Sequence, residues 1–154
     1  MEFIMNRNAF TMIELIFVIV ILGILAAIAI PKLAATRDDA NVAKAAMEIA
    51  SALNDMGSYY TSKGSFNHDA SIMTNVKLTQ QGGGSGAIAS GDSERWDYMI
   101  KNENCIDMNA TGDGNISVIV GASSVSICQR LQNAINHLIQ ESPHQYGGNA
   151  ISRE

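Results

Sequence analysis

Three histidines and two cysteines are the residues of this 154-residue sequence that most often carry catalysis or bind transition metals. The histidines, His68, His137 and His144, share no metal-ligand spacing, and neither Cys105 nor Cys128 has a local partner signature. Scattered histidines in a small domain are usually surface residues. The sequence therefore predicts neither an enzyme nor a bound cofactor.

The stretch DMNATGDGN at 107–115 is similar to the start of a calcium-binding loop. Calcium prefers oxygen ligands, and oxygen-bearing side chains recur here at alternate positions: Asp107, Asn109, Thr111 and Asp113. The twelfth position holds Val118, where such a loop needs a bidentate glutamate. We therefore expect a solvated turn between two strands, with a calcium site at Asp107, Asn109 and Asp113 as the alternative.

One carboxylate, Glu14, stands at the edge of the longest apolar run in the chain. No polar side chain occurs from Leu15 to Ile30, and Met12 and Ile13 precede the carboxylate. A charged carboxylate near the centre of a bilayer costs about 2.5–3.5 kcal/mol on insertion scales unless it is paired or close to the interface. Glu14 therefore requires a partner if the run enters a membrane.

The apolar run has the length of a membrane span. Phe10 to Ile30 covers 21 residues, close to the roughly 20 that cross the hydrocarbon core. It exceeds the roughly 7–15 residues of a secretory signal core, and no small-residue cleavage site follows it. We expect a retained single-pass segment over 10–31. Arg7 favours a cytoplasmic N-terminus, whereas Lys32 and Arg37 oppose that orientation.

The remainder of the chain, 32–154, is polar and mildly acidic, with 9 basic and 13 acidic side chains. This balance argues against a large nucleic-acid interface, which needs a basic face, so no nucleic-acid partner is expected. Cys105 and Cys128 fit an oxidising exterior, where one disulfide is the default and two buried thiols are the alternative.

The apolar pattern predicts one long helix. From Val42 to Tyr60 apolar residues recur at spacings of three and four, and no turn cluster interrupts 32–54. We expect a helix from about Phe10 to Tyr60, apolar all round in its first half and amphipathic over 32–60. Gly23 and Pro31 are the expected points of bending.

The second half of the chain predicts a small sheet. Residues 61–95 should form a variable loop, including the glycine-rich stretch 81–92. Strand patterns at 96–101, 105–109 and 115–121 predict about three antiparallel strands, with the long helix against one face. A short C-terminal helix is expected within 124–140, completing the sheet-and-helix region 96–140, and a loose tail over 141–154. The expected fold class is α+β.

The residues AFTMIEL (Ala9–Leu15), followed by an apolar helix ending in AIAIPKL, resemble the N-terminus of type IV prepilins and type II secretion pseudopilins. The resemblance covers about the first 40 residues. It implies a leader at 1–9, starting at Met1 or Met5, an assembly helix at 10–31 and a pilin-like soluble domain at 32–154. It also implies that a prepilin peptidase cuts between Ala9 and Phe10 and methylates the new amine. Ala9 departs from the glycine usual before the cut.

The resemblance further implies a structural subunit that polymerises through its N-terminal helix into a pilus or secretion pseudopilus. Its partners would be other pilin-like subunits, the prepilin peptidase, an inner-membrane assembly platform and the bilayer. The soluble domain would lie outside the cytoplasm. The assembly residues would be Phe10, Thr11, Glu14 and Pro31. In a bundle of staggered copies, Glu14 of one subunit would meet the Phe10 amine of its neighbour and fix the register.

Two alternatives stay open at this point. One is a bitopic membrane anchor whose extracytoplasmic domain binds a partner as a monomer. The other is a minor pilin of a DNA-uptake system. The small domain with one disulfide favours a secretion pseudopilin among the filament systems.

Overall fold

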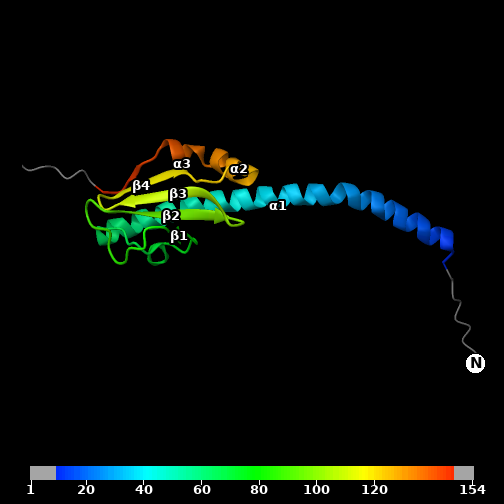
Figure 1. Ribbon diagram of the computed structural model, residues 1–154, viewed down its shortest axis with the longest axis horizontal. Coiled ribbons are helices and arrows are strands. Elements are labelled where there is room, and N and C mark those ends of the chain that lie inside the picture. Colours follow the sequence, from blue (N-terminus) through cyan, green and yellow to red (C-terminus); the bar gives the residue numbers. More distant parts are fainter. Residues whose placement is uncertain (1–9, 148–154) are drawn as a thin grey trace, which may run out of the picture. The chain divides into compact units, whose positions relative to one another are not determined.

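The computed structural model describes residues 10–147, apart from the side chain of Ala34. The chain divides into two compact units, Met1–Asp38 and Asp39–Glu154, and helix α1 (Met12–Lys63) contributes to both. The first unit consists, in its described part, of the N-terminal portion of α1 (Figure 1). The second unit contains the remaining portion of α1, a sheet and two short helices. The predicted α+β class is confirmed.

Helix α1 differs little from its prediction. It begins at Met12 instead of Phe10, continues through Gly23 and Pro31, and ends at Lys63 instead of Tyr60. Gly64 follows with φ +74°, and its N–H donates to the carbonyl of Tyr60 at 2.7 Å. A glycine in this left-handed conformation is the common end of a helix, because a side chain there would be strained.

The sheet has five antiparallel strands in the order β1-β2-β3-β4-β5. The three long strands overlap the predicted ranges and are β2 (Ser93–Ile100), β3 (Glu103–Thr111) and β4 (Asn115–Val120). β2 begins three residues earlier than predicted, inside the expected loop 61–95, and β3 extends two residues beyond its predicted range at each end. The two edge strands, β1 (Thr79–Gln80) and β5 (His144–Gln145), were not predicted, since two residues carry no alternation pattern. The pairing register places Asp97 opposite Asp107, and Asp107 opposite Ile119.

The C-terminal region departs from prediction in two ways. The single helix expected within 124–140 is divided into α2 (Ser126–Ala134) and α3 (Asn136–Gln140), because Ile135 leaves helical geometry at φ −106°, ψ 17°. The tail expected to be loose is ordered up to Gly147: it forms β5, and the Tyr146 hydroxyl donates to the carbonyl of Leu53 at 3.0 Å. Residues 148–154 lie outside the described part of the chain.

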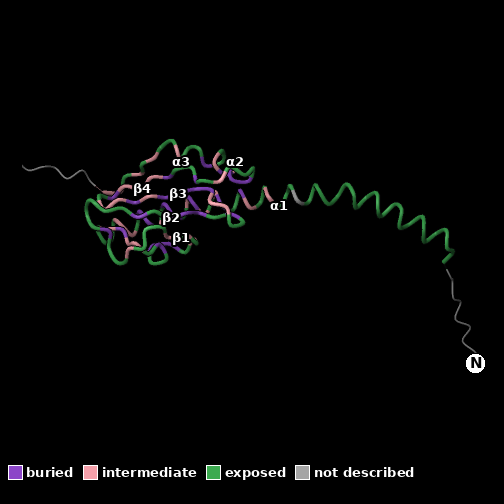
Figure 2. The backbone as a smooth tube through the Cα atoms, viewed as in Figure 1, coloured by how far each residue is buried: buried purple, intermediate pink, exposed green. Residues whose placement is uncertain are grey.

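The core of the second unit lies between the amphipathic portion of α1 and the sheet. The stripe of α1 that faces it is almost entirely buried: Val42, Ala45, Ile49, Ala52, Leu53 and Met56 (Figure 2). Trp96 on β2 is fully buried and donates its Nε1–H to the carbonyl of His68 at 2.9 Å. The tryptophan thus lies in the core with its one polar atom satisfied by a backbone acceptor.

The segment before β2 is held by a buried carboxylate that the sequence does not reveal. Glu94, with 1% of its side chain exposed, accepts from the Gly82 N–H at 2.6 Å and from Gln80 Nε2 at 3.0 Å, and lies 2.7 Å from His68 Nδ1. Burial alone would raise the pKa of Glu94, but the side-chain and backbone donors outweigh it and lower that pKa. A β-carbon on Gly82 would collide with this carboxylate. The glycine-rich stretch is thus fitted closely around Glu94.

Candidate functional site: the N-terminal assembly segment

Thr11 and Glu14 form a reciprocal set of hydrogen bonds at the start of α1. The Thr11 backbone N–H and its hydroxyl both donate to Glu14 Oε2, each at 2.8 Å. In return the Glu14 backbone N–H donates to Thr11 Oγ1 at 3.3 Å. Thr11 is therefore the N-cap residue of the helix, and Glu14 is its third helical residue.

This arrangement is a capping box, in which each of two residues satisfies a backbone donor of the other. The first N–H groups of a helix have no intrahelical acceptor, and a carboxylate also interacts favourably with the positive end of the helix dipole. The capping role was not predicted from the sequence, although the spacing T-x-x-E at Thr11 and Glu14 is its signature. The Glu14 carboxylate therefore has hydrogen-bond donors within its own chain.

Phe10 lies directly before this cap, outside the helix and 87% exposed. The Glu14 carboxylate is bonded to the residue that follows Phe10, so it lies at the end of the chain that cleavage before Phe10 would create. Ala9, on the other side of the expected cut, lies outside the described residues. Pro31, the fourth residue expected in assembly, is exposed within α1.

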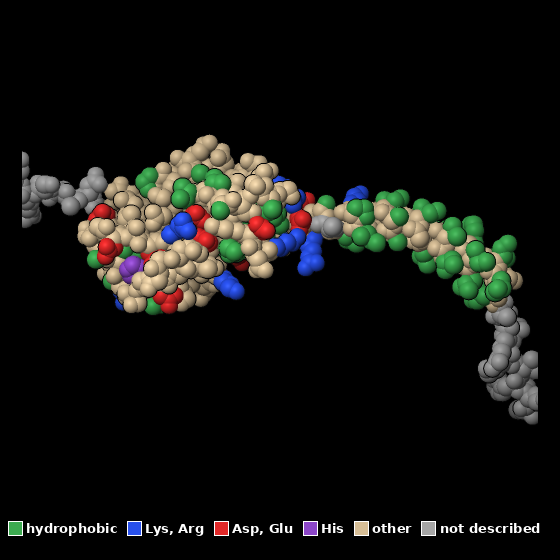
Figure 3. Space-filling view, in the orientation of Figure 1, with side chains coloured by type: hydrophobic (Ala, Val, Ile, Leu, Met, Phe, Trp, Pro, Cys, Tyr) green, Lys and Arg blue, Asp and Glu red, His purple; other side chains and the backbone are tan. Residues whose placement is uncertain are grey.

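The helix beyond the cap presents apolar side chains on all sides. Every large apolar residue from Phe10 to Leu33 is exposed, and Figure 3 shows them gathered along this portion of α1. The segment is long and apolar enough to cross a membrane, and none of it is buried within the chain. An exposed apolar surface of this kind marks contact with lipid or with other protein chains.

The residues of the calcium alternative engage different partners. Asp107 Oδ1 accepts from Asn104 Nδ2 at 2.8 Å, whereas Asp113 Oδ1 accepts from the Ser90 hydroxyl at 2.7 Å. Asn109 pairs within the sheet, opposite Arg95. Burial raises the pKa of the Asp97 carboxyl, and the charge of Asp107 opposite raises it further. Within residues 10–147 no group of three or more His, Cys, Asp or Glu side chains could hold a metal.

The three histidines lie apart from one another. His68 contacts Glu94, His144 Nε2 lies 2.9 Å from the carbonyl of Leu138, and His137 is exposed. The two cysteines come together: Cys105 on β3 and Cys128 on α2 form a disulfide pair with Cα atoms 4.8 Å apart. This pair links α2 to β3 of the sheet.

Comparison with known families bears on this same N-terminal segment. Residues 4–30 match the family model described as the prokaryotic N-terminal methylation motif. No curated protein and no solved structure matches the chain. The matched residues include Phe10, Thr11, Glu14 and most of the exposed apolar helix. The chain therefore carries the prokaryotic N-terminal methylation motif, the hallmark of the type IV pilin and pseudopilin family.

Proposed function

We propose that this chain is a structural subunit of a type IV pilus or a type II secretion pseudopilus. A prepilin peptidase cuts it between Ala9 and Phe10 and methylates the new amine, and the mature chain polymerises through the apolar portion of α1. The observation that carries the proposal is the match of residues 4–30 to the methylation motif, a range that includes the Thr11–Glu14 cap. The fully exposed apolar helix supports it, since such a surface requires lipid or other subunits.

The cap gives Glu14 a role both before and after assembly. In the single chain its Oε2 accepts two hydrogen bonds from Thr11, which partly compensate the carboxylate during its stay in the membrane. In a filament the amine of a neighbouring Phe10, positive at neutral pH, becomes the additional partner. A charge pair between staggered helices sets a register that apolar contacts alone leave free.

The mature subunit is held in the inner membrane by one span, with its soluble domain outside the cytoplasm. An assembly platform extracts it from the membrane into the filament. The disulfide between Cys105 and Cys128 forms in the oxidising compartment that the soluble domain occupies. The soluble domain favours a secretion pseudopilus among the possible machines because it is small and has a single cysteine pair.

The first test is the intact mass of the protein purified from membranes of cells with an active prepilin peptidase. We expect the mass of Phe10–Glu154 with one added methyl group, and a gain of two hydrogens on reduction. A chain that retains Ala9 in such cells contradicts the processing step.

The second test asks whether the Glu14 charge is needed for subunit register in the filament or only for anchoring in the membrane. Glu14→Gln keeps the size of the side chain and one acceptor oxygen but removes the charge. We expect cleavage and membrane insertion to persist and incorporation into filaments to fall below detection. Glu141→Gln, at an exposed position of the soluble domain, is the matched control and should assemble normally. Normal incorporation of Glu14→Gln would show that the charge does not set the register.

One observation favours a second function, a bitopic anchor with a monomeric domain. Because Thr11 caps Glu14 within the same chain, the carboxylate has partners without any neighbouring subunit. An anchor needs neither the cut before Phe10 nor the Glu14 charge. Unprocessed wild-type protein that stays monomeric beside a working assembly platform would establish the anchor.

A further inference from the structure

The second unit contains a lysine-lined cleft that the filament role does not use. The cleft has a volume of about 390 Å³ and lies between α1, the segment leading into β1, and the end of β2 with its turn. Its polar lining includes Lys44 and Glu48 on α1, Lys77 before β1, Thr79 in β1, Tyr98 on β2, and Lys101 in the turn. We propose that this lysine cleft binds a phosphate group, carried either by a free phosphate ion or by a lipid headgroup.

The charge of the lysine cleft is opposite to that of the chain. The protein has five lysines and a formal net charge of −5, yet three of those lysines, Lys44, Lys77 and Lys101, line this one cleft. Only one acidic residue, Glu48, lies among the lining residues. Three segments far apart in sequence therefore bring an excess of positive charge to one concave surface, which concentrates anions there.

The one carboxylate in the lining is already engaged. The buried Tyr98 hydroxyl donates to Glu48 Oε2, and Lys44 Nζ lies 3.4 Å from Glu48 Oε1. Burial raises the pKa of Tyr98, and the hydrogen bond to Glu48 and its charge raise it further, so the phenol stays protonated as a donor. Glu48 thus offsets one of the three lysine charges, and the lining residues keep a formal excess of two positive charges.

The turn at the rim has an unusual composition for its geometry. Lys101 and Asn102 both have positive φ, at 52° and 67°, in a two-residue connection between β2 and β3. Such turns favour Gly, Asn or Asp, because other residues are strained in the left-handed region. Asn102 fits this preference and Lys101 does not. The strained position keeps an ammonium-bearing side chain among the residues that line the cleft.

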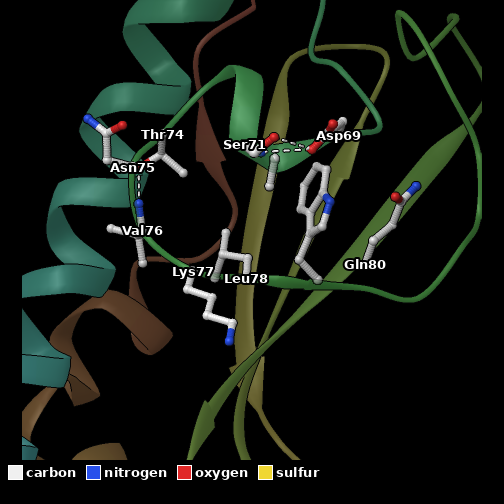
Figure 4. A pocket seen from close by; sticks show the side chains of 10 residues that line it. Asp69, Ser71, Thr74, Asn75, Val76, Lys77, Leu78 and Gln80 are labelled. Atoms are coloured by element: carbon white, nitrogen blue, oxygen red, sulfur yellow. Dashed lines mark hydrogen bonds between the residues drawn. The ribbon is translucent and has the colours of Figure 1, made fainter.

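The chemistry of the lining matches a phosphate. Lysine ammonium groups bind phosphate as compact point charges with several donors each, and the Asn102 amide and Thr79 hydroxyl add neutral donors. A neighbouring cleft beside the 3₁₀ helix η1 (Ala70–Ile72) provides the contrast (Figure 4). It is smaller, at about 280 Å³, and its lining has a single lysine, Lys77, together with Asp69. The positive excess thus distinguishes the lysine cleft from this neighbouring cleft.

The test uses the full chain in a neutral detergent and calorimetric titration with three probes. Inorganic phosphate supplies the free ion. Short-chain phosphatidylglycerol supplies the phosphate on an anionic headgroup, and short-chain phosphatidylcholine supplies it neutralised by choline. We expect saturable binding of phosphate, of phosphatidylglycerol or of both, weakening as salt is raised because the lysine charges are screened.

The variants locate the binding. A triple variant should bind the probe roughly 100-fold more weakly; it combines Lys44→Gln, Lys77→Gln and Lys101→Gln. Each lysine near an anionic group contributes about a factor of five in affinity. The same three positions changed to arginine should retain it. Lys32→Gln with Lys63→Gln, the two lysines outside the cleft, is the matched control and should bind as wild type. Unchanged Trp96 fluorescence would show that each variant is folded.

The outcomes are distinct. Binding of phosphatidylglycerol alone identifies a lipid headgroup as the source, and binding of inorganic phosphate alone identifies the free ion. The absence of saturable binding of both probes overturns the proposal. So does an equal loss of binding in the Lys32 and Lys63 control, because the charge of the lysine cleft would then have no special part.

Discussion

The two portions of α1 differ in how far their apolar side chains are buried. Ile19, in the first unit, leaves 57% of its surface exposed, whereas Ile49, in the second, leaves none. Both belong to one continuous helix and both are isoleucine. The second portion finds its apolar partner in the sheet of its own chain. The first finds none among the described residues.

The carboxylates of the two regions show the same difference. Glu94 is enclosed by donors from its own chain, including His68, Gln80 and the Gly82 N–H. Glu14 accepts hydrogen bonds only from Thr11 within the described part of the chain. The second region buries its apolar side chains within one molecule, whereas the described residues leave those of the first region exposed.

The largest expected effect comes from matched isoleucine truncations. Ile49→Ala removes buried side-chain volume and should lower the free energy of unfolding by about 2–5 kcal/mol. Ile19→Ala should leave it unchanged, because Ile19 has no core contacts to lose. Urea titration in detergent, followed by Trp96 fluorescence, measures both. Equal losses for the two variants would remove the distinction between the regions.

The Cys105–Cys128 disulfide lies within the second region and should raise the free energy of unfolding of that region alone. Replacing Cys105 and Cys128 together with alanine releases a link that spans 23 residues. In the chain-entropy model this costs about 3 kcal/mol. Thermal unfolding of the double variant, compared with reduced wild type, should show the same loss in both. A wild-type protein whose unfolding does not respond to reductant contradicts this prediction.

Glu94 should make the stability of the second region depend on pH. Its pKa in the folded state is lowered, so its contribution to stability is present above its ordinary pKa of 4.5 and is lost as the pH falls through the lower folded value. Glu94→Gln should lose about 1–3 kcal/mol at pH 7, because buried donors lose a charged acceptor. The difference from wild type should shrink in acid. Glu141→Gln, which is exposed, should follow the wild-type profile at every pH.

The smallest effect tests the cap of the first region. Thr11→Val removes the hydroxyl that accepts from the Glu14 N–H and donates to its carboxylate. Loss of such a cap costs about 1 kcal/mol and should be confined to the first helical turn. Amide hydrogen exchange of the chain in detergent should accelerate there and nowhere in the second unit. Thr11→Ser, which keeps the hydroxyl, should exchange as wild type does.

The sequence predicts the features that depend on neighbouring residues. The period of apolar residues from Val42 to Tyr60 predicts the buried stripe of α1, and alternation predicts β2, β3 and β4. The T-x-x-E spacing at Thr11 and Glu14 was present in the sequence and could have predicted the cap. The apolar run also predicts an apolar surface, and the described residues leave that surface exposed.

Features that depend on distant residues were not predictable in this way. His68 and Glu94 are 26 positions apart, and nothing in either local sequence indicates that they meet. The lysine cleft likewise combines α1, the approach to β1 and the β2–β3 turn. The division of the C-terminal helix at Ile135 has no signal in the sequence, since the apolar pattern continues through it. Contacts between residues far apart in the chain leave no local pattern from which they could be predicted.

The burial of Trp96 has a spectroscopic consequence. It is the only tryptophan in the protein, and its indole N–H is bonded to the carbonyl of His68 within the second unit. Its emission should be blue-shifted in the folded protein and move to longer wavelength when the sheet opens. Because no tryptophan lies in the apolar portion of α1, this signal reports on the second unit alone, and it would do so in the proposed filament as well. The protein thus contains an intrinsic optical probe of unfolding in the second unit.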